Sequence, residues 1–466
     1  MLVNNSTSPR LSRRGFLLGT AGLVGTALLP MSLTGCSRAG AGSSGAGMSF
    51  MYWGSSYEDE IIRKMLTSFQ KKSGVAMRPM FTSGDQYDTK VNTLVASNTP
   101  ADVAYMHDYM VYDLAEKGQL LNLYPQFDKH PQLQDRLPGT YYFWDDGKCA
   151  GNQTGTTAIL MYYSKKAIKE AGLENPPAVP GSAWNWDQFV SAADKLTLDQ
   201  AGRHPSDSGF DPNNIKQYGA AAFFNWWYGF VRSNGGDIAN EDGTKYALDS
   251  AEAIQALQDL QDLIVKHRVA PNPKQQGAPG ASGSDTSTDF RTGRVALSFD
   301  GTWAMLNLNK QKIDYGIGVM PKHQQQVTLQ LSGATVIANG TKKPSDAVDF
   351  YLYHNDPHNV TELFTSGLWL PLEKKYYTNE ADIRFWTDNE NHPAEFRTAV
   401  IDALMTNAVT IYSQRLRNIN AITQVLNPAI DRIASGSQTA AEVCKGLRDQ
   451  IQPLLKGMYP NPMLGK

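Results

Sequence analysis

The stretch MSFMYWGSS, residues 48–56, decides the fold class, because an apolar, aromatic-rich run typical of a β-strand ends there in a glycine and two serines. An amphipathic helix is expected next, since apolar residues recur at helical spacing over 61–69 and the residues around them are polar. Ser56 is typical of a helix start and Gly74 of a helix end. A strand followed by a helix in this way indicates an α/β protein.

The alternation continues along the chain, with strands expected at 75–81 and 102–106 and helices at 87–96 and 110–117. Such an order predicts a largely parallel sheet covered by helices. In open sheets of this kind, ligands bind outside the carboxyl ends of the strands. Trp53 and Asp108 both fall just past such ends.

The N-terminal region carries the features of an export signal. Residues 12–17, SRRGFL, are similar to a twin-arginine signal, and residues 33–36, LTGC, are similar to a bacterial lipobox that places lipid on Cys36. The apolar run between them could instead be a transmembrane anchor, but it is short for a span and holds three glycines and Pro30. We therefore expect residues 1–35 to be an export signal of the twin-arginine type with a lipobox.

Composition limits the classes of partner. Residues 36–47 are mostly Ala, Gly and Ser, which predicts a flexible tether. The formal net charge is −2, and no Lys/Arg run has interleaved aromatic residues, so no nucleic-acid partner is expected. No second apolar stretch approaches the length of a membrane span, so attachment would depend on lipid at Cys36. Cys149 and Cys444 could pair in an oxidising compartment, but their spacing gives no signature of a disulfide framework.

Six segments carry a family resemblance, and they are Asn98–Leu121, Gly155–Phe189, Trp226–Asp237, Phe290–Trp303, Tyr315–Pro321 and Gly333–Ala338. In this order the chain resembles the extracellular solute-binding proteins of carbohydrate ABC importers, which include maltose-, trehalose- and glycerol-phosphate-binding proteins. The resemblance covers essentially everything from Met48 to the C-terminus.

The resemblance implies a two-lobed, periplasmic-binding-protein-like α/β fold, with crossover hinge segments near Gly155 and Gly333 and a ligand cleft between the lobes. By that pattern, lobe one is expected at 48–155 plus 332–368 and lobe two at 156–331 plus 369–466. Together with the export signal and the lipobox at Cys36, it predicts an exported monomer that is lipid-anchored to the outer face of the cytoplasmic membrane or periplasmic. Its expected partners are a carbohydrate and the membrane permease subunits of an ABC importer.

A sugar site needs flat aromatic surfaces for the apolar face of the ring and carboxylates or amides for its hydroxyls. Of nine tryptophans, five stand at turns or element ends and are candidate ligand contacts: Trp53, Trp226, Trp227, Trp303 and Trp369. For each of them core packing is the alternative. Two polar candidates, Asn225 and Asp300, stand next to Trp226 and close before Trp303.

Further candidates come from the resemblance. Asp108 matches the position whose carboxylate accepts from sugar hydroxyls, although it could instead cap the helix expected at Met110. Gln86 and Tyr87 stand where the family contacts ligand from lobe one. Gly333 could allow the backbone to approach the ligand at the return crossing.

Catalytic motifs are mostly absent, and no cofactor, metal or enzymatic activity is expected. The chain has no nucleophile elbow, phosphate loop or cysteine-based zinc spacing. His354 and His358 have the i, i+4 spacing of metal ligands, but Pro357 interrupts the helix, which favours an incidental surface pair. Two alternatives to a sugar receptor stay open: a binder of a phosphorylated polyol such as glycerol phosphate, and an exported glycosidase.

Overall fold

The structure is a computed structural model, and it describes residues 47–221, 223–272, 275 and 286–464. The expected export signal, the lipobox and all of the expected tether except Gly47 lie outside the described residues. Within the described part of the chain, no helix is both long enough and apolar enough to cross a membrane.

The first sheet has six strands in the order β2-β1-β3-β12-β5-β4. These strands are β1 (Met48–Tyr52), β2 (Met77–Phe81), β3 (Val103–Met106), β4 (Tyr141–Asp145), β5 (Lys148–Gln153) and β12 (Ala334–Ile337). β1 pairs in parallel with β2 and β3, as the sequence predicts. β12 then joins β3 and β5 in antiparallel fashion, and β4 pairs antiparallel with β5. The expectation of a largely parallel sheet is therefore wrong beyond β3.

The second sheet has seven strands, with β13-β11-β6-β9-β8-β7 in line and β10 paired to β6. They are β6 (Thr157–Ser164), β7 (Leu198–Asp199), β8 (Ile215–Ala221), β9 (Val295–Gly301), β10 (Tyr315–Gly318), β11 (Thr328–Leu331) and β13 (Ala408–Thr410). Among the described strands of this sheet, the β8–β9 and β11–β13 pairs alone are parallel. The chain is therefore built on two mixed sheets, one in each lobe.

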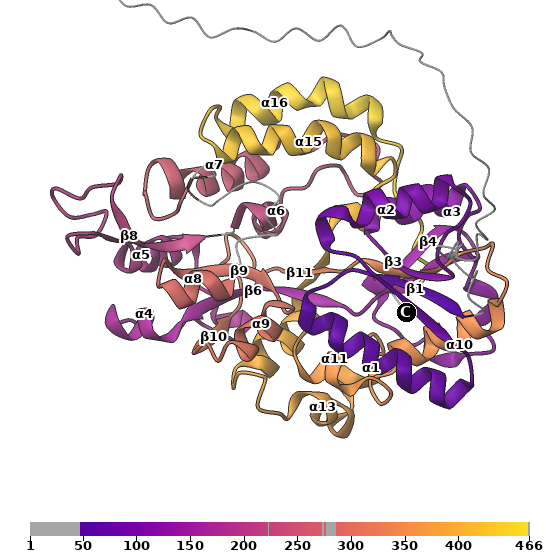
Figure 1. Cartoon of the computed structure of the whole chain (residues 1–466). Helices are drawn as coiled ribbons and strands as arrows, with labels where there is room; N and C mark the ends of the chain where they lie inside the picture. The colour runs from indigo at the N-terminus through magenta and orange to yellow at the C-terminus, as the bar shows by residue number, and fades with distance from the viewer. Residues whose placement is uncertain (1–46, 222, 273–274, 276–285, 465–466) are drawn as a thin grey trace, which may run out of the picture. The chain divides into compact units, whose positions relative to one another are not determined.

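Helices flank both sheets. Those packed around the first sheet include α1 (Ser56–Ser73), α2 (Gly84–Ala96), α3 (Asp108–Glu116), α10 (Pro344–Asn355) and α11 (Thr361–Thr365). α1 and α10 lie on one face of the first sheet, and α2 and α3 lie on the other (Figure 1). Alternation along β1 follows this arrangement, because Phe50 packs edge-on against Phe350 of α10 while the next residue, Met51, faces α2.

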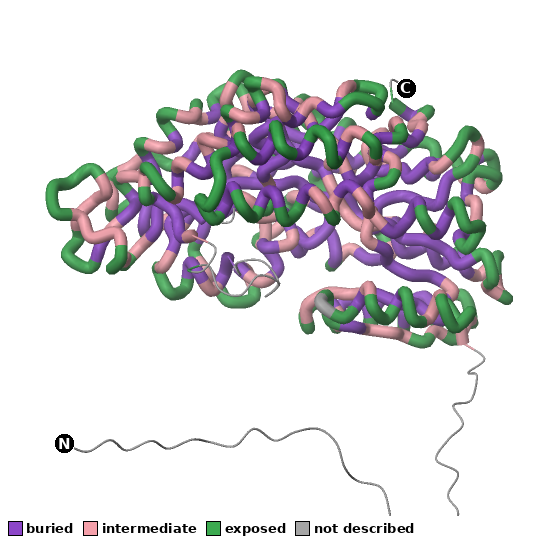
Figure 2. The backbone as a smooth tube through the Cα atoms, turned by 90° about the horizontal axis from the view of Figure 1, so that it is seen from above, coloured by how far each residue is buried: buried purple, intermediate pink, exposed green. Residues whose placement is uncertain are grey.

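The remaining helices follow in chain order: α4 (Lys165–Glu170), α5 (Trp186–Leu196), α6 (Trp227–Ser233), α7 (Ala251–Val265), α8 (Thr286–Thr292), α9 (Ala304–Lys310), α12 (Lys375–Thr378), α13 (Glu380–Thr387), α14 (Ala403–Asn407), α15 (Ile419–Ala434) and α16 (Ala440–Ile451). α15 and α16 pack on each other and on α7 (Figure 1). Buried residues follow the strands through the interior, and exposed residues follow the outer sides of the helices (Figure 2). Cys149 and Cys444 are both buried and free, and burial raises the pKa of each thiol to about 12.

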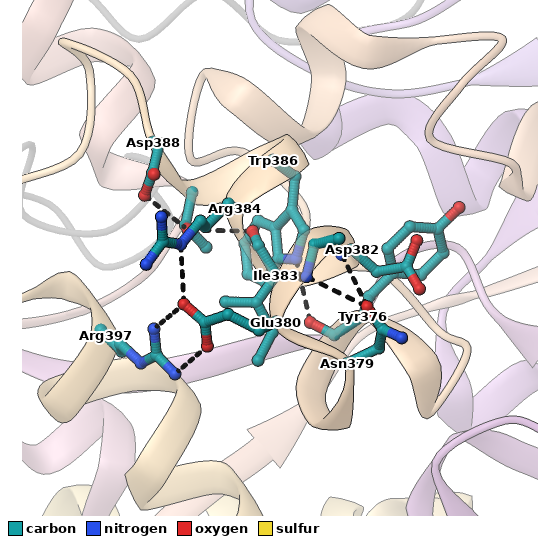
Figure 3. Close-up of polar contacts among 11 residues, drawn as sticks. Tyr376, Asn379, Glu380, Asp382, Ile383, Arg384, Trp386, Asp388 and Arg397 are labelled. Carbon is teal, nitrogen blue, oxygen red and sulfur yellow. Dashed lines mark hydrogen bonds and ion pairs between the residues drawn. The ribbon is translucent and has the colours of Figure 1, made fainter.

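Helix α13 is held by a group of polar contacts that Figure 3 shows. Asn379 caps the helix by accepting from the backbone N–H groups of Ala381 and Asp382. Glu380 accepts from Nε of Arg384 at 2.8 Å and from both terminal nitrogens of Arg397 at 2.9 and 2.7 Å. Since Arg397 begins a π-helical turn, this two-pronged contact fixes α13 against the next element of the chain.

Helix α1 begins as the sequence predicts, and its first turn buries a carboxyl group. Ser55 caps the helix by accepting from the backbone N–H of Glu58 at 3.2 Å, and Gly74 ends it in a left-handed conformation with φ 75°. The Glu58 side chain is buried beside Gly54. Because burial penalises the charged form, it raises the pKa of Glu58 from 4.5 to about 8.

This burial gives a testable pH dependence. The folded state holds the proton of Glu58 more tightly than the unfolded state, so the stabilisation is complete below about pH 4.5 and is lost as the pH rises toward 8. Glu58→Gln is expected to remove that loss, raising the free energy of unfolding at pH 9 by on the order of a few kcal/mol relative to the unsubstituted protein. Urea unfolding of both proteins at pH 5, 7 and 9 measures this difference in the free energy of unfolding. Glu60→Gln on the exposed side of the same helix is the control and should leave the pH 5–9 profile unchanged.

Candidate functional site

The candidate site lies where the chain crosses between the two sheets. β5 ends at Gln153 and β6 begins at Thr157, while β11 ends at Leu331 and β12 begins at Ala334. The two crossings are bonded to each other, since the backbone N–H of Thr154 donates to the carbonyl of Gly333 at 2.8 Å. A third passage runs beside them, where Thr156 and Leu370 form a β-bridge. Gly155 and Gly333 therefore stand at the crossings, where the resemblance placed them.

Tryptophan rings pack against both of these glycines. A Cβ on Gly333 would lie 2.5 Å from the ring of Trp53 and 2.7 Å from the carbonyl oxygen of Met106. A Cβ on Gly155 would lie 2.6 Å from Cβ of Trp369. Any larger residue would displace a ring or the backbone at the crossing, so the close packing requires glycine.

On the side of the first sheet, an aromatic stack follows the carboxyl ends of β1 and β3. The ring of Trp53 lies on the ring of His107, with centroids 4.4 Å apart and planes 15° apart. The ring of Tyr109 is also nearly parallel to that of His107, with centroids 5.5 Å apart and planes 10° apart. All three side chains are half-buried. The stack offers flat apolar surface next to polar ring atoms, as recognition of an amphipathic ring requires.

Asp88 on α2 orients this stack. Its carboxylate lies 2.7 Å from Nδ1 of His107 and also accepts a hydrogen bond from the hydroxyl of Tyr109. Burial alone would raise the pKa of Asp88, but the hydrogen bonds from His107 and Tyr109 hold that pKa below its ordinary value. Because an ionised carboxylate only accepts, Nδ1 of His107 carries the proton and the ring orientation is fixed.

Asp108 begins α3 and faces the segment that follows β13. One carboxylate oxygen accepts from the backbone N–H of Tyr109 at 2.8 Å, and the other accepts from the hydroxyl of Ser413. Burial raises the pKa of Asp108, and both hydrogen bonds oppose that change. The Asp108 side chain is half-buried in the first turn of α3. The alternative role as helix cap does not apply, because His107 is the N-cap residue.

On the side of the second sheet, Trp226 and Trp303 form a second aromatic pair. Their ring centroids are 5.8 Å apart, and both side chains are half-buried. Nε1 of Trp226 donates to the carbonyl of Phe299 at 2.9 Å, which fixes this ring. The ring of Trp303 lies over Gly301, where a Cβ would be only 2.3 Å away.

Tyr109 and Trp303 each pack against both hydrophobic core clusters of the protein. They stand at the ends of elements that belong to different sheets, Tyr109 after β3 and Trp303 after β9. Half-exposed aromatic surface from both sheets is therefore gathered where the two cores meet. A ligand placed there can contact both lobes.

Several residues expected at the site are buried instead. Trp227 is 6% exposed, Trp369 is 5% exposed and Tyr87 has no exposed surface. The hydroxyl of Tyr87 lies within hydrogen-bonding distance of two backbone carbonyl oxygens, that of Met51 at 3.1 Å and that of Tyr105 at 2.8 Å. In this conformation these three side chains support neighbouring strands and rings.

The other candidates lie at the surface or at the edge of the site. Asn225 is exposed beside Trp226, and Gln86 is exposed on α2, where it shares a shallow depression with Lys90. Asp300 is half-buried and accepts from the hydroxyl of Thr286 and from the backbone N–H of Gly301, both at 2.8 Å.

Four side chains of this region are not among the candidates named from the sequence. His107 and Tyr109 could have been found, because they flank Asp108 just past the end of a strand. Asp88 stands on a helix, and Ser413 is 305 residues from the carboxylate it contacts, so neither gives a local signal. Tertiary structure alone brings them to the site.

The described residues show no group of three or more His, Cys, Asp or Glu side chains that could hold a metal ion. His358 is exposed, but His354 is buried, with Nε2 lying 3.0 Å from the hydroxyl of Tyr105. Burial lowers the pKa of His354 to about 3. The expectation of a surface histidine pair is therefore wrong for His354, because this residue belongs to the core.

The protein has two α/β lobes that are joined by crossing segments of the chain. Aromatic side chains from both lobes gather where the lobes meet, which is typical of a protein that captures a small molecule between them. Residues 64–394 match the family described as bacterial extracellular solute-binding protein. The chain belongs to this family.

Known relatives agree in sequence and in fold. The chain is 23% identical over 318 residues to the sn-glycerol-3-phosphate-binding periplasmic protein UgpB of Rhizobium meliloti, covering 65% of this chain and 68% of the relative. The ABC substrate-binding protein Lmo0181 from Listeria monocytogenes, solved with cycloalternan, superposes with a TM-score of 0.71 at 22% identity, over 87% of this chain and 98% of the other. UgpB from Mycobacterium tuberculosis, solved with glycerophosphocholine, gives a TM-score of 0.70 at 16% identity, over 89% and 99%.

Proposed function

We propose that this protein is the substrate-binding receptor of an ABC importer and that it captures a neutral sugar or oligosaccharide between its lobes. The observation that carries the proposal is the half-exposed aromatic surface of Trp53, Tyr109, Trp226 and Trp303 at the junction of the two cores. Aromatic faces stack on the apolar face of a pyranose, and the carboxylates of Asp88 and Asp108 beside them accept from hydroxyl groups. The similar Listeria protein was solved with an oligosaccharide of this chemistry, cycloalternan.

A phosphorylated polyol is the second candidate, because relatives include glycerol-phosphate-binding proteins. A phosphate dianion is expected to recruit arginine or lysine. Arg232 is instead ion-paired with Asp237, and Lys90 donates to the hydroxyl of Thr82 at 3.0 Å. Because both of these cations are engaged and the carboxylates of Asp88 and Asp108 lie next to the aromatic surfaces, we favour a neutral ligand.

A thermal-shift screen separates the candidates, because a tight ligand raises the unfolding temperature by mass action. Mono-, di- and oligosaccharides and sn-glycerol 3-phosphate are compared at equal concentration. We expect a neutral saccharide to give the largest shift. A larger shift with sn-glycerol 3-phosphate would overturn this choice of ligand. Chromatography of the recovered sugar tests the third candidate, since release of shorter sugars would indicate a glycosidase instead of a receptor.

We also infer how the receptor works and how it is organised. Some contacts to the ligand form only when both lobes touch it, and these contacts would shift the population toward a closed form. The hinges would lie near Gly155 and Gly333, and the closed monomer would dock on the permease. The proposed lobes are 48–155 plus 332–368 and 156–331 plus 369–466. The binding residues proposed for the site are the eleven candidates named from the sequence, of which Tyr87, Trp227 and Trp369 are buried in this conformation, together with Asp88, His107, Tyr109 and Ser413.

The proposed lipid anchor gives a prediction about localisation. Cys36→Ala is expected to leave folding and ligand binding intact and to release the exported protein from membranes, because lipid on Cys36 is the anchor that the sequence offers. Fractionation followed by a carbonate wash measures the release, and Cys149→Ala serves as a control that should stay membrane-bound. Retention of the Cys36→Ala protein after the wash would contradict the anchor.

A further inference from the structure

Near the end of the described chain, residues 457–463 form a strap between the two sides of the molecule, called here the C-terminal strap. At its start, the backbone N–H of Gly457 donates to the carbonyl of Gly243, on the side of the second sheet, at 3.1 Å. Near its end, the amide of Asn461 donates to the carbonyl of Pro138, just before β4 of the first sheet, at 2.9 Å. The strap therefore links the two sides in addition to the crossings described above.

Two buried side chains hold the strap on the side of the first sheet. Tyr459 is 4% exposed and Met463 is 8% exposed, and both belong to the core cluster that contains β1 and β3. The ring of Tyr459 stacks on the ring of Tyr112 of α3, with centroids 3.8 Å apart and planes 12° apart. The guanidinium of Arg417 lies over the Tyr459 ring, 4.2 Å from its centroid. Burial of this apolar and aromatic surface keeps the strap in place.

The backbone of the strap pairs with a segment that follows β13. The N–H of Tyr459 donates to the carbonyl of Arg415 at 2.7 Å. Next to this bond, Leu416 and Met458 form an antiparallel β-bridge. The residues before it, Tyr412–Gln414, are a single 3-10 turn, which is too short to hold its position by itself. The strap thus supplies the backbone partner of the segment that carries this turn.

The turn reaches both sides of the candidate site. The ring of Tyr412 packs edge-on against a tyrosine of α6, on the side of the second sheet. The hydroxyl of Ser413 donates to the carboxylate of Asp108, on the side of the first sheet. The side-chain carbonyl of Gln414 accepts from the amide of Gln153, at the end of β5, at 2.9 Å. Movement of this turn would therefore disturb polar contacts at the junction of the lobes.

Asp108 depends on the turn for its charge and its direction. Burial raises the pKa of Asp108, and the hydrogen bond from Ser413 opposes that rise. Without this donor, the carboxyl group would take up a proton more readily and lose capacity to accept from ligand hydroxyls. The donor also fixes one oxygen of the carboxylate, so it sets where the remaining lone pairs point. The acceptor geometry at Asp108 thus follows the position of Ser413.

We propose that the C-terminal strap is a positioning element of the proposed sugar site. Tyr459 stacks on Tyr112 and holds the turn, and the turn places Ser413 where it orients the carboxylate of Asp108. Tyr459 itself is buried and acts on the ligand through Ser413. The proposal rests on the proposed function for its ligand, whereas the hold of the strap on the turn is measured with no ligand present.

Hydrogen–deuterium exchange of the ligand-free exported protein measures that hold. In Tyr459→Ala, amides within 411–417 are expected to exchange on the order of ten-fold faster, because the strap no longer holds this segment. Tyr459→Phe keeps the stacked ring and should exchange as the unsubstituted protein does. Tyr353→Ala is the matched control, since Tyr353 is a buried tyrosine of the same core cluster with Lys72 5.3 Å from its ring centroid. It lies on α10 and should leave exchange within 411–417 unchanged.

Titration calorimetry measures the effect on binding, with the ligand that gives the largest thermal shift. Tyr459→Ala and Ser413→Ala are each expected to lower affinity about ten-fold, the loss typical of one hydrogen bond to a charged group. Because Tyr459 acts through Ser413, the double variant should bind no more weakly than the weaker single variant. Tyr459→Phe should restore affinity. Tyr353→Ala should keep full affinity even where its melting temperature falls.

Three results would overturn the proposal: unchanged exchange within 411–417 in Tyr459→Ala, unchanged affinity of that variant, or losses that multiply in the double variant. Circular dichroism first checks folding. If Tyr459→Ala does not fold, Tyr459→Leu takes its place with the same expected results, since it keeps an apolar side chain but not the flat ring. If the unsubstituted protein binds neither a saccharide nor sn-glycerol 3-phosphate, the proposed function fails instead, and the exchange measurement alone decides whether the strap holds the turn.

Discussion

Trp303→Ala is expected to weaken binding of the sugar by roughly 1–4 kcal/mol, the span typical of an aromatic hot spot. The ring is half-buried, lies over Gly301 and contacts both core clusters, so its remaining surface is available where the two lobes meet. Removing it takes away a stacking surface from the ligand while leaving Trp226 held by its hydrogen bond to Phe299. Calorimetric titration with the best saccharide of the screen measures the loss.

Trp186→Ala is the matched control. Trp186 begins α5, is also half-buried, and stacks on His323 with ring centroids 4.5 Å apart and planes 18° apart. It is therefore expected to lose stability, up to the roughly 3–5 kcal/mol of a core tryptophan, with little change in affinity. Thermal melts and titrations are made on both variants. Unfolding of the Trp303→Ala protein, together with loss of binding by a stable Trp186→Ala protein, would reverse the two assignments.

Local patterns predicted the first part of the fold well. The apolar spacing of 61–69, the start signal at Ser56 and the stop at Gly74 act within one helix, and α1 runs from Ser56 to Ser73, although Ser55 rather than Ser56 is its cap. The direction of the strands beyond β3 was predicted wrongly for a physical reason. β12 enters the first sheet between β3 and β5 from more than 180 residues further along the chain, and no local pattern reports that pairing.

The candidate site was harder to predict, because position at the end of an element does not determine burial. Trp226 and Trp227 are neighbours in sequence, yet Trp226 stays half-exposed while Trp227 turns into the core. Tyr87 is one of the candidates from the resemblance, and in the structure it is buried, with its hydroxyl within hydrogen-bonding distance of carbonyls of two adjacent strands. Burial of this kind depends on how helices pack on the sheet, and sequence periodicity carries little information about it.

Gly333→Ala is expected to lower both stability and affinity. The added Cβ would lie 2.5 Å from the ring of Trp53 and 2.7 Å from the carbonyl oxygen of Met106. A ring can move, but the carbonyl belongs to β3 and is held in the sheet, so the crossing itself must shift. Overpacking of this kind costs about 1–3 kcal/mol. Displacing Trp53 also disturbs its stack on His107, which links the hinge to the proposed sugar surface.

Gly340→Ala is the control for this prediction, because a Cβ at Gly340 meets no atom within 4 Å. It lies in the turn after β12, seven residues from Gly333, and its substitution should change stability by less than about 0.5 kcal/mol. Thermal melts give the stability of each variant, and titration with the sugar gives the affinity. Equal stability and affinity of the two variants would mean that Trp53 and the crossing do not depend on glycine at 333. A loss confined to Gly333→Ala would instead tie lobe closure to the packing of one ring on one glycine, since the same substitution seven residues away leaves both properties intact.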